Sequence, residues 1–213
     1  MEGEAPTKKR RRLSRERVLD AAIDLARADG LSGVSMPSVS RSLGTTPMSL
    51  YRHVESKDAL VLGMLARVTA MIDVPLLRND PVEEVVAVFE SIYDMLRRDP
   101  WTVQHFLQGY SGSEPVRALV SRSLTALNGL GLEQGDAWQA HQALLRYTYG
   151  EVLAAEASAK GGLRYDVVDD APTEADETIR EFENAAPAEQ SGERYRETLQ
   201  RYLRSALDEV GSS

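Results

Sequence analysis

Apolar residues recur every three or four positions along almost the whole chain, and this spacing limits the possible folds more than any other sequence feature. In residues 82–98 it places Val85, Phe89, Ile92 and Leu96 on one face of a helix. No stretch of useful length alternates apolar and polar residues as a half-buried strand would. The pattern predicts an all-α fold, with helices at 15–29, 34–43, 46–54, 56–72, 82–98, 100–108, 114–128, 136–160, 173–185 and 193–209.

Charge is distributed unevenly along the 213 residues, which carry a net charge of −8. Residues 1–60 hold 11 Lys and Arg against 8 Asp and Glu, whereas residues 61–213 hold 14 against 25. A charge asymmetry of this kind indicates a nucleic-acid-binding end on an acidic body. We therefore predict a basic arm at 1–13, a DNA-binding domain at 14–60 with a connecting helix at 57–72, and a ligand-binding and dimerisation domain at 61–213.

Several classes of protein do not fit this sequence. The chain has no cysteine, which rules out disulfides and thiolate metal sites. No apolar run approaches the roughly 18 residues of a membrane helix, and no apolar segment follows the basic start as it would in an export signal. Neither a glycine-rich phosphate loop nor a nucleophile–histidine–acid pattern is present. We predict a cytoplasmic protein that is not an enzyme and needs no cofactor or metal.

The segment from Val34 to Val54 has the organisation of a helix-turn-helix. Ser35 can cap the first helix, and Gly44 stands in the turn. The second helix turns Leu50 and Val54 inward and carries Thr46, Ser49, Arg52 and His53 on another side. A helix of this kind fits the major groove of DNA with its N-terminal residues at the base edges.

Residues 17–67 resemble the TetR family of bacterial repressors. The resemblance rests on Val18 to Ala22, Leu25-Ala26, Gly30, Val39, Leu43-Gly44, Leu50 to Val54 and Lys57 to Leu60. It implies contacts with phosphates or bases by Ser35, Thr46, Ser49, Tyr51, His53 and Lys57. Pro37 and Pro47 replace base-reading residues of tetracycline-type members, and proline has no N–H to donate. The operator must therefore differ from theirs.

The basic arm is a further candidate for DNA contact, because arginines of a flexible arm can enter an A·T-rich minor groove. Its candidate residues are Arg10, Arg11 and Arg12. For these DNA-binding candidates, alternatives without DNA contact stay open. The arm can be a solvated tail, Tyr51 can pack in the domain core, and His53 can be a structural histidine.

Residues 147–156 are similar to the dimer-helix region of the tetracycline-repressor-like subgroup. Helices 136–160 and 193–209 are apolar on more than one side, which also predicts a homodimer. Aromatic residues and histidines of the second domain form the pool of predicted ligand contacts, although each can equally be a core or interface residue. They are Phe89, Tyr93, Trp101, His105, Phe106, Trp138, His141 and Tyr147.

The sequence thus predicts a dimeric repressor that a small-molecule ligand releases from a palindromic DNA operator. An alternative is a DNA-binding regulator that answers to a protein partner instead of a small ligand. A closed apolar cavity in the second domain would favour the first hypothesis. An exposed apolar patch would favour the second.

Overall fold

The computed structural model describes residues 12–210 except 111, 160–176, 179–180 and 182–191. These residues form helices and connecting turns, and no strand occurs among them. The chain divides into two compact units, Met1–Val68 and Thr69–Ser213. Their helices are α1 (Arg15–Asp29), η1 (Leu31–Gly33), α2 (Met36–Ser42), α3 (Pro47–Leu50), α4 (Lys57–Ala70), α5 (Pro81–Arg98), η2 (Pro100–Thr102), α6 (Val103–Leu107), α7 (Glu114–Gly129), α8 (Gln134–Ala159) and α10 (Gly192–Val210).

The first unit is a small helical domain built around the apolar face of α1. Ser14 caps this helix by accepting a hydrogen bond from the backbone N–H of Arg17 at 3.3 Å. Val18, Ala22 and their neighbours on the same face are buried, as the period of the sequence predicts. The core is completed by Val34, Val39, Leu50, Val54, Leu60, Met64 and Leu65, all of them buried.

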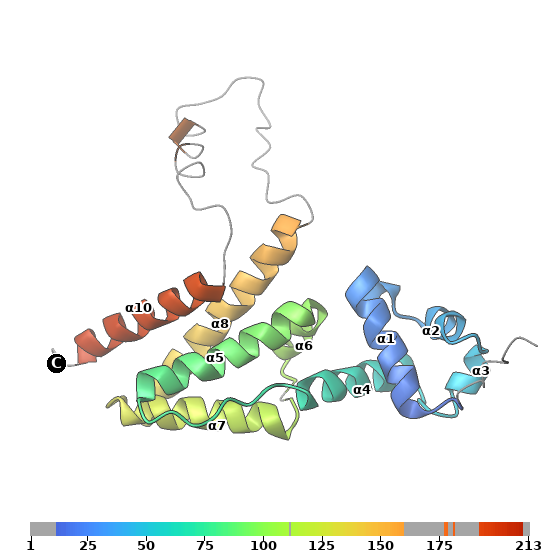
Figure 1. The fold of residues 1–213 in the computed structure, drawn as a ribbon, viewed down its shortest axis with the longest axis horizontal. Coiled ribbons are helices and arrows are strands. Elements are labelled where there is room, and N and C mark those ends of the chain that lie inside the picture. The colour runs from blue at the N-terminus through green and yellow to red at the C-terminus, as the bar shows by residue number, and fades with distance from the viewer. Residues whose placement is uncertain (1–11, 111, 160–176, 179–180, 182–191, 211–213) are drawn as a thin grey trace, which may run out of the picture. The chain divides into compact units, whose positions relative to one another are not determined.

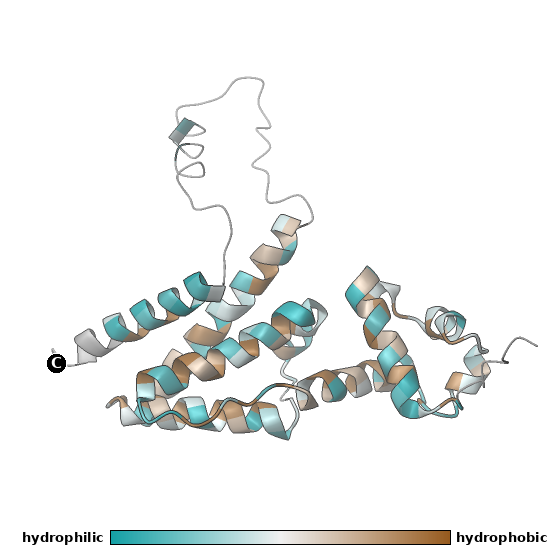
Figure 2. Cartoon of the chain, viewed as in Figure 1, coloured by the Kyte–Doolittle hydropathy of each residue, from teal (hydrophilic) through white to brown (hydrophobic). Residues whose placement is uncertain are grey.

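The second unit is organised around α5, which packs against α7, α8 and α10 (Figure 1). Every residue from Glu84 to Phe89 is buried, so this helix is enclosed on more than one side. Large core side chains from the surrounding helices meet it, including Leu119, Leu127, Leu144 and Leu199. In Figure 2, α10 shows mostly hydrophilic colours to the viewer, because its apolar residues form a narrow stripe.

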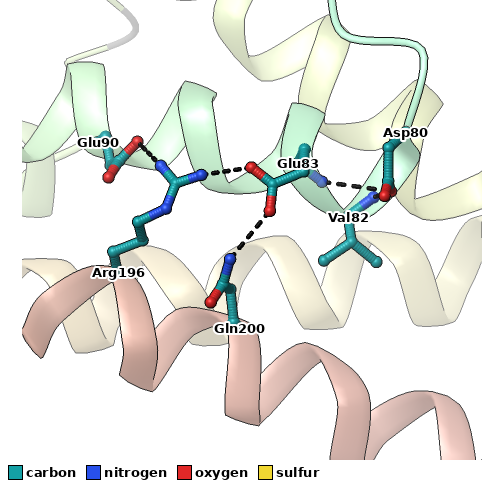
Figure 3. Close-up of polar contacts among 6 residues, drawn as sticks. All are labelled: Asp80, Val82, Glu83, Glu90, Arg196 and Gln200. Carbon is teal, nitrogen blue, oxygen red and sulfur yellow. Dashed lines mark hydrogen bonds and ion pairs between the residues drawn. The ribbon is translucent and has the colours of Figure 1, made fainter. Parts of the chain in front are cut away.

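Polar contacts hold α10 in register on α5 (Figure 3). Arg196 pairs with Glu83 and with Glu90, in the second case at 2.6 Å from Nη1 to Oε2. Gln200 donates to the other carboxylate oxygen of Glu83 at 2.9 Å. The Glu90 carboxylate accepts from Arg196 and, with the charge of Glu83, raises the pKa of that guanidinium, so the contact is ionic at any physiological pH.

Three tyrosine rings, one each from α5, α8 and α10, stack in parallel where these helices meet in the core. The ring of Tyr195 lies 4.0 Å from that of Tyr93 and 5.7 Å from that of Tyr147, measured between centroids. The Tyr195 hydroxyl is hydrogen-bonded to Thr148 Oγ1 at 2.7 Å. Burial raises the pKa of Tyr195, so the hydroxyl stays protonated. These contacts fix the rotation of α10 about its own axis.

The helix bounds differ from the predicted ones mainly at one place. The helix expected at 46–54 is assigned only over Pro47–Leu50 and continues as a turn to His53. Val54 still donates to the Leu50 carbonyl at 3.0 Å, so the chain keeps one further helical turn of hydrogen bonding. The connecting helix ends at Ala70, two residues before the predicted end. Most of the predicted helix at 173–185 lies outside the described residues.

None of the helices in the described part of the chain is long and apolar enough to cross a membrane.

Candidate functional site

The helix-turn-helix is built by local capping interactions in the first unit. Ser35 Oγ accepts from the backbone N–H of Ser38 at 3.1 Å, and Ser38 Oγ accepts from that of Ser35 at 2.8 Å. This capping box satisfies free N–H groups at the start of α2. Gly44 ends the helix with φ of 61°, a left-handed conformation that costs little only for glycine. The turn then delivers the chain to Thr46, the N-cap of α3.

α3 and the turn that follows it are anchored by two buried apolar residues, Leu50 and Val54. Other side chains of this stretch reach solvent: Thr46, Arg52 and Lys57, the first residue of α4, are exposed, and Tyr51 is 49% exposed. Tyr51 is therefore not a core residue of this unit. Ser49 and His53 are half-buried. The arrangement leaves hydroxyl, guanidinium, imidazole and ammonium groups available on one short stretch of chain.

Two predicted DNA-binding hydroxyls also have a structural task. Ser35 and Thr46 are N-caps, and Thr46 Oγ1 lies 3.0 Å from Ser49 Oγ. Ser35 Oγ donates its proton to Ser38 Oγ at 3.0 Å, so a phosphate contact would require this hydroxyl to change its acceptor. Thr46 Oγ1 can accept from Ser49 Oγ and donate its own proton to a phosphate oxygen, so capping and DNA contact are compatible at Thr46.

The basic arm falls mostly outside the described residues, which include neither Arg10 nor Arg11. Arg12 is exposed, and its carbonyl oxygen accepts from the Arg17 guanidinium at 3.0 Å.

One exposed residue of α3 was missing from the predicted set. Met48 is 72% exposed, although methionine is ordinarily a core residue. It lies two residues before the buried Leu50, which in a helix places it on nearly the opposite side. That offset from the apolar anchor was the available sequence signal.

A cavity of about 620 Å³ lies inside the second unit, a size suited to one drug-sized molecule. Its wall draws on α5, α6, α7 and α8, and also includes Ile72, which follows the end of α4 by two residues. The lining residues are mostly apolar, with a few polar groups among them. The wall is formed by Ile72, Ile92, Met95, Leu96, Phe106, Leu107, Gly109, Tyr110, Val116, Arg117, Val120, Trp138, His141, Gln142, Leu145, Arg146 and Tyr149.

Three of the eight predicted ligand residues, Phe106, Trp138 and His141, line this cavity. The other five lie outside its lining. Phe89, Tyr93 and Trp101 are buried in the core, His105 packs edge-on against Trp101 with ring centroids 6.4 Å apart, and Tyr147 stacks on Tyr195.

The physical reason for this division is helix rotation. On α5, Ile92, Met95 and Leu96 turn toward the cavity, whereas the neighbouring Tyr93 stacks on a ring of α10. Aromatic character alone does not reveal which face of a helix meets which neighbour. The polar members of the wall, including Arg117, Gln142, Arg146 and Tyr149, were missed because no local pattern sets them apart from surface residues.

The titratable groups in the wall are neutral where they are most buried. Burial lowers the pKa of His141 to about 4, and its Nδ1 is hydrogen-bonded to Ser123 Oγ at 2.9 Å. Burial also raises the pKa of Tyr149 to about 12. The His141 ring lies between aromatic neighbours, 5.4 Å from Phe89 and 6.1 Å from Trp138 between centroids. At neutral pH this part of the wall is therefore a hydrogen-bonded, uncharged aromatic surface.

No group of three or more potential metal-ligating side chains occurs within the described ranges. His105 and His141, the two histidines of the second unit, belong to no such group within those ranges.

Known proteins resemble both units. Residues 18–64 match the family model described as "Bacterial regulatory proteins, tetR family". The HTH-type transcriptional repressor DrrR1 of Streptomyces coeruleorubidus is 38% identical over 94 residues, which are 43% of this chain and 35% of that repressor. The chain thus spans about a third of the length of this curated relative.

Solved structures extend the likeness beyond the first unit. The Streptomyces coelicolor TetR family protein ActR in complex with actinorhodin superposes with a TM-score of 0.68 at 19% identity, covering 95% of this chain and all of that one. BioQ with its double-stranded DNA operator superposes with a TM-score of 0.59 at 18% identity, covering 70% of this chain and 89% of that one. At these identities the likeness establishes the fold.

The family match covers the helix-turn-helix described above, and the solved structures share the fold on both sides of it. Residues 18–64 thus match the DNA-binding region of the TetR family of bacterial regulatory proteins, and the chain as a whole shares the fold of solved TetR-family structures.

Proposed function

We propose that the protein is a homodimeric transcriptional repressor of the bacterial cytoplasm, released from a palindromic DNA operator when a small molecule enters the cavity of its second unit. The observation that carries this proposal is the combination of exposed polar side chains around α3, from Thr46 to Lys57, with a largely apolar cavity in one chain. Structures of BioQ with its operator and of ActR with actinorhodin support each half.

In the proposed complex, α3 enters the major groove. Thr46, Ser49 and Tyr51 donate to phosphates or base edges from their hydroxyls, and Lys57 supplies a positive charge at the start of α4. Met48 adds an apolar contact to a thymine methyl group. Ser35, His53 and the arginines Arg10, Arg11 and Arg12 complete the proposed interface.

Coupling between ligand and DNA would run along α4. This helix begins at Lys57 and ends at Ala70, and Ile72 just beyond it lines the cavity. A ligand therefore contacts the chain directly after the helix that leads back to the DNA-binding residues. The two reading heads of a dimer must lie roughly 34–36 Å apart to use successive major grooves. A ligand-driven coupling of about 1–3 kcal/mol would weaken operator binding about 5- to 150-fold.

Dimerisation is proposed through α8 and α10. Leu153 and Tyr202 on these helices are exposed in the isolated chain, so they are available to a second copy. A two-fold dimer also matches a palindromic operator. Light scattering at micromolar concentration, without DNA, should report twice the 23.5 kDa of one chain. A monomer mass would contradict this part of the proposal.

The DNA interface can be tested without knowing the operator, because a binding site can be selected from random double-stranded DNA. Tyr51→Phe and Lys57→Ala should weaken binding to the selected site and reduce its salt dependence, since each removes a phosphate contact. Arg201→Ala, in the second unit, serves as a control for loss of a positive charge and should leave both quantities unchanged. Equal effects of the test and control variants would refute the assigned interface.

A second candidate function is regulation by a protein partner. Among the described residues, Met71, Val74, Leu76 and Leu77 form an exposed apolar stretch between α4 and α5, as a partner-binding surface would. The two functions differ in a thermal-shift screen of the purified protein. A compound that raises the melting temperature and releases DNA supports the ligand hypothesis. If Leu76→Ser/Leu77→Ser abolishes regulation in cells while purified DNA binding is unchanged, the partner hypothesis is favoured.

A further inference from the structure

The cavity has a charge that is opposite to that of the unit around it. Among the described residues, its wall includes two arginines, Arg117 and Arg146, and no aspartate or glutamate. Residues 61–213 as a whole carry 25 acidic and 14 basic side chains, so acidic residues would be expected there by composition alone. The exclusion of carboxylates from this wall therefore points to a negatively charged occupant.

Both arginines lack an ionic partner within the described residues. Arg146 is an exposed residue of α8 and makes no ion pair with any residue that the structure describes. Arg117 on α7 donates from Nη1 to the Gly112 carbonyl at 3.1 Å, a contact that leaves its charge uncompensated. By contrast, Arg122 on the same helix pairs with a glutamate at 2.6 Å. Guanidinium groups placed in this way can pair with the planar oxygens of a carboxylate.

The remainder of the wall suits a flat, carbon-rich body. Trp138 and His141 are stacked with an angle of 29° between their planes, and Phe106 meets Tyr110 edge-on with centroids 5.8 Å apart. Ile92, Met95, Val116, Val120 and Leu145 supply aliphatic surface. Because His141 and Tyr149 are neutral, the two guanidiniums are the charged groups at neutral pH among the described residues of the wall.

We infer that the ligand of this cavity is an aromatic organic acid, whose carboxylate pairs with Arg117 or Arg146 while its ring system packs among Phe106, Trp138 and His141. This inference rests on the proposed function in taking the cavity as the effector site. A cation of the same shape is disfavoured, because the described part of the wall offers it two positive charges and no negative one.

Three probes of nearly equal shape test the charge of the occupant directly: pyrene carboxylate, pyrene methanol and pyrene methylammonium. Titration calorimetry of the full chain should give at least tenfold tighter binding of the carboxylate than of the alcohol, because a charge-assisted hydrogen bond contributes about that factor. The ammonium compound should bind more weakly than the alcohol. Equal binding of the three probes, or no binding of the carboxylate, would overturn the inference.

Variants of the two arginines test whether these side chains cause the preference for the carboxylate probe. Arg117→Met/Arg146→Met should erase the advantage of the carboxylate while leaving the affinity for the alcohol within about threefold, since the apolar wall is unchanged. Arg201→Met removes one exposed arginine of α10 and should leave the preference intact. A preference that survives in the double variant would refute the assignment.

Binding to selected double-stranded DNA, measured without any probe, separates this inference from the proposed function. A preference for the carboxylate without DNA binding would support the ligand class and contradict the repressor function. DNA binding without a preference for the carboxylate would support the repressor function and contradict the ligand class.

Discussion

The ion pair between Glu84 on α5 and Arg122 on α7 should make a large contribution to stability. Arg122 Nε lies 2.6 Å from Glu84 Oε1, and the side chains are only 17% and 6% exposed. The same two residues hold the connection between α4 and α5: Arg122 Nη1 donates to the Pro75 carbonyl at 2.6 Å, and Glu84 Oε2 accepts from the Arg78 backbone N–H at 2.8 Å. Removing either residue leaves its partner's charge buried and unpaired.

The expected magnitude follows from burial. Two unit charges about 4 Å apart attract by about 4 kcal/mol at an effective dielectric constant of 20, and removing one member of a buried pair costs about 3–5 kcal/mol. We therefore expect Arg122→Met and Glu84→Gln each to lower the free energy of unfolding by about 3 kcal/mol. The double variant should cost little more than either single one, because no unpaired charge is left behind.

The exposed pair of Arg67 with Asp20 provides a matched control, since it is equally short at 2.5 Å but its side chains are 34% and 50% exposed. Arg67→Met should cost less than about 1 kcal/mol, because solvent screens this pair. Urea unfolding followed by circular dichroism, at one fixed protein concentration, measures all these variants. A coupling energy between Glu84 and Arg122 below about 0.5 kcal/mol, or equal costs for Arg122→Met and Arg67→Met, would refute the reasoning.

The same pair predicts a pH dependence. Burial tends to raise the pKa of Glu84, but hydrogen bonds from the Arg122 side chain and the Arg78 backbone, with the charge of Arg122, outweigh it and lower that pKa below 4.5. The contribution of the carboxylate is thus present above the unfolded-state pKa and lost as pH falls through the lower, folded-state pKa. The stability difference between the wild type and Glu84→Gln should therefore shrink in acid.

Three further outcomes are expected. Because burial lowers the pKa of His141 to about 4, the free energy of unfolding should fall by roughly 3 kcal/mol as the pH drops from 6.5 to 4. In unfolding curves measured across this range, His141→Gln should make the free energy of unfolding less dependent on pH. Gly44→Ala should lower the melting temperature by an amount equivalent to about 1 kcal/mol, and Gly44→Asn should lower it by less. The reason is the φ of 61°, since no atom lies within 4 Å of an added Cβ. Equal melting temperatures of the wild type and the two variants would contradict this. Tyr195→Phe should lower the free energy of unfolding in urea by only about 1 kcal/mol, because Thr148 still donates to the Leu144 carbonyl at 2.7 Å. Tyr195→Ala should lower it by about 3–5 kcal/mol. Comparable losses for the two variants would show that the hydroxyl contributes more to stability than the ring.

Local features of the fold could be predicted from the sequence because they depend on residues close together in the chain. Ser14 and Ser35 accept hydrogen bonds from N–H groups three residues later, and Gly44 adopts the positive φ expected at a helix end. The period of apolar residues identified α1 and α5, since burial of one stripe is the main stabilising force for a helix. The helix-turn-helix follows from these short-range rules, whereas the exposure of Tyr51, for which the sequence left a core position open, was decided by the packing of the unit.

Contacts between distant segments were decided only by the tertiary structure. Phe89 and Tyr93 had the same aromatic signature as Phe106 and Trp138, yet the rotation of α5 turned the first two away from the cavity and the packing of α6 and α8 brought the other two into its wall. Arg117 and Arg146 are ordinary arginines in the sequence and share a cavity only because α7 packs on α8. Such sites depend on how helix faces meet, and the spacing of residues along one helix carries no information about its neighbour's rotation.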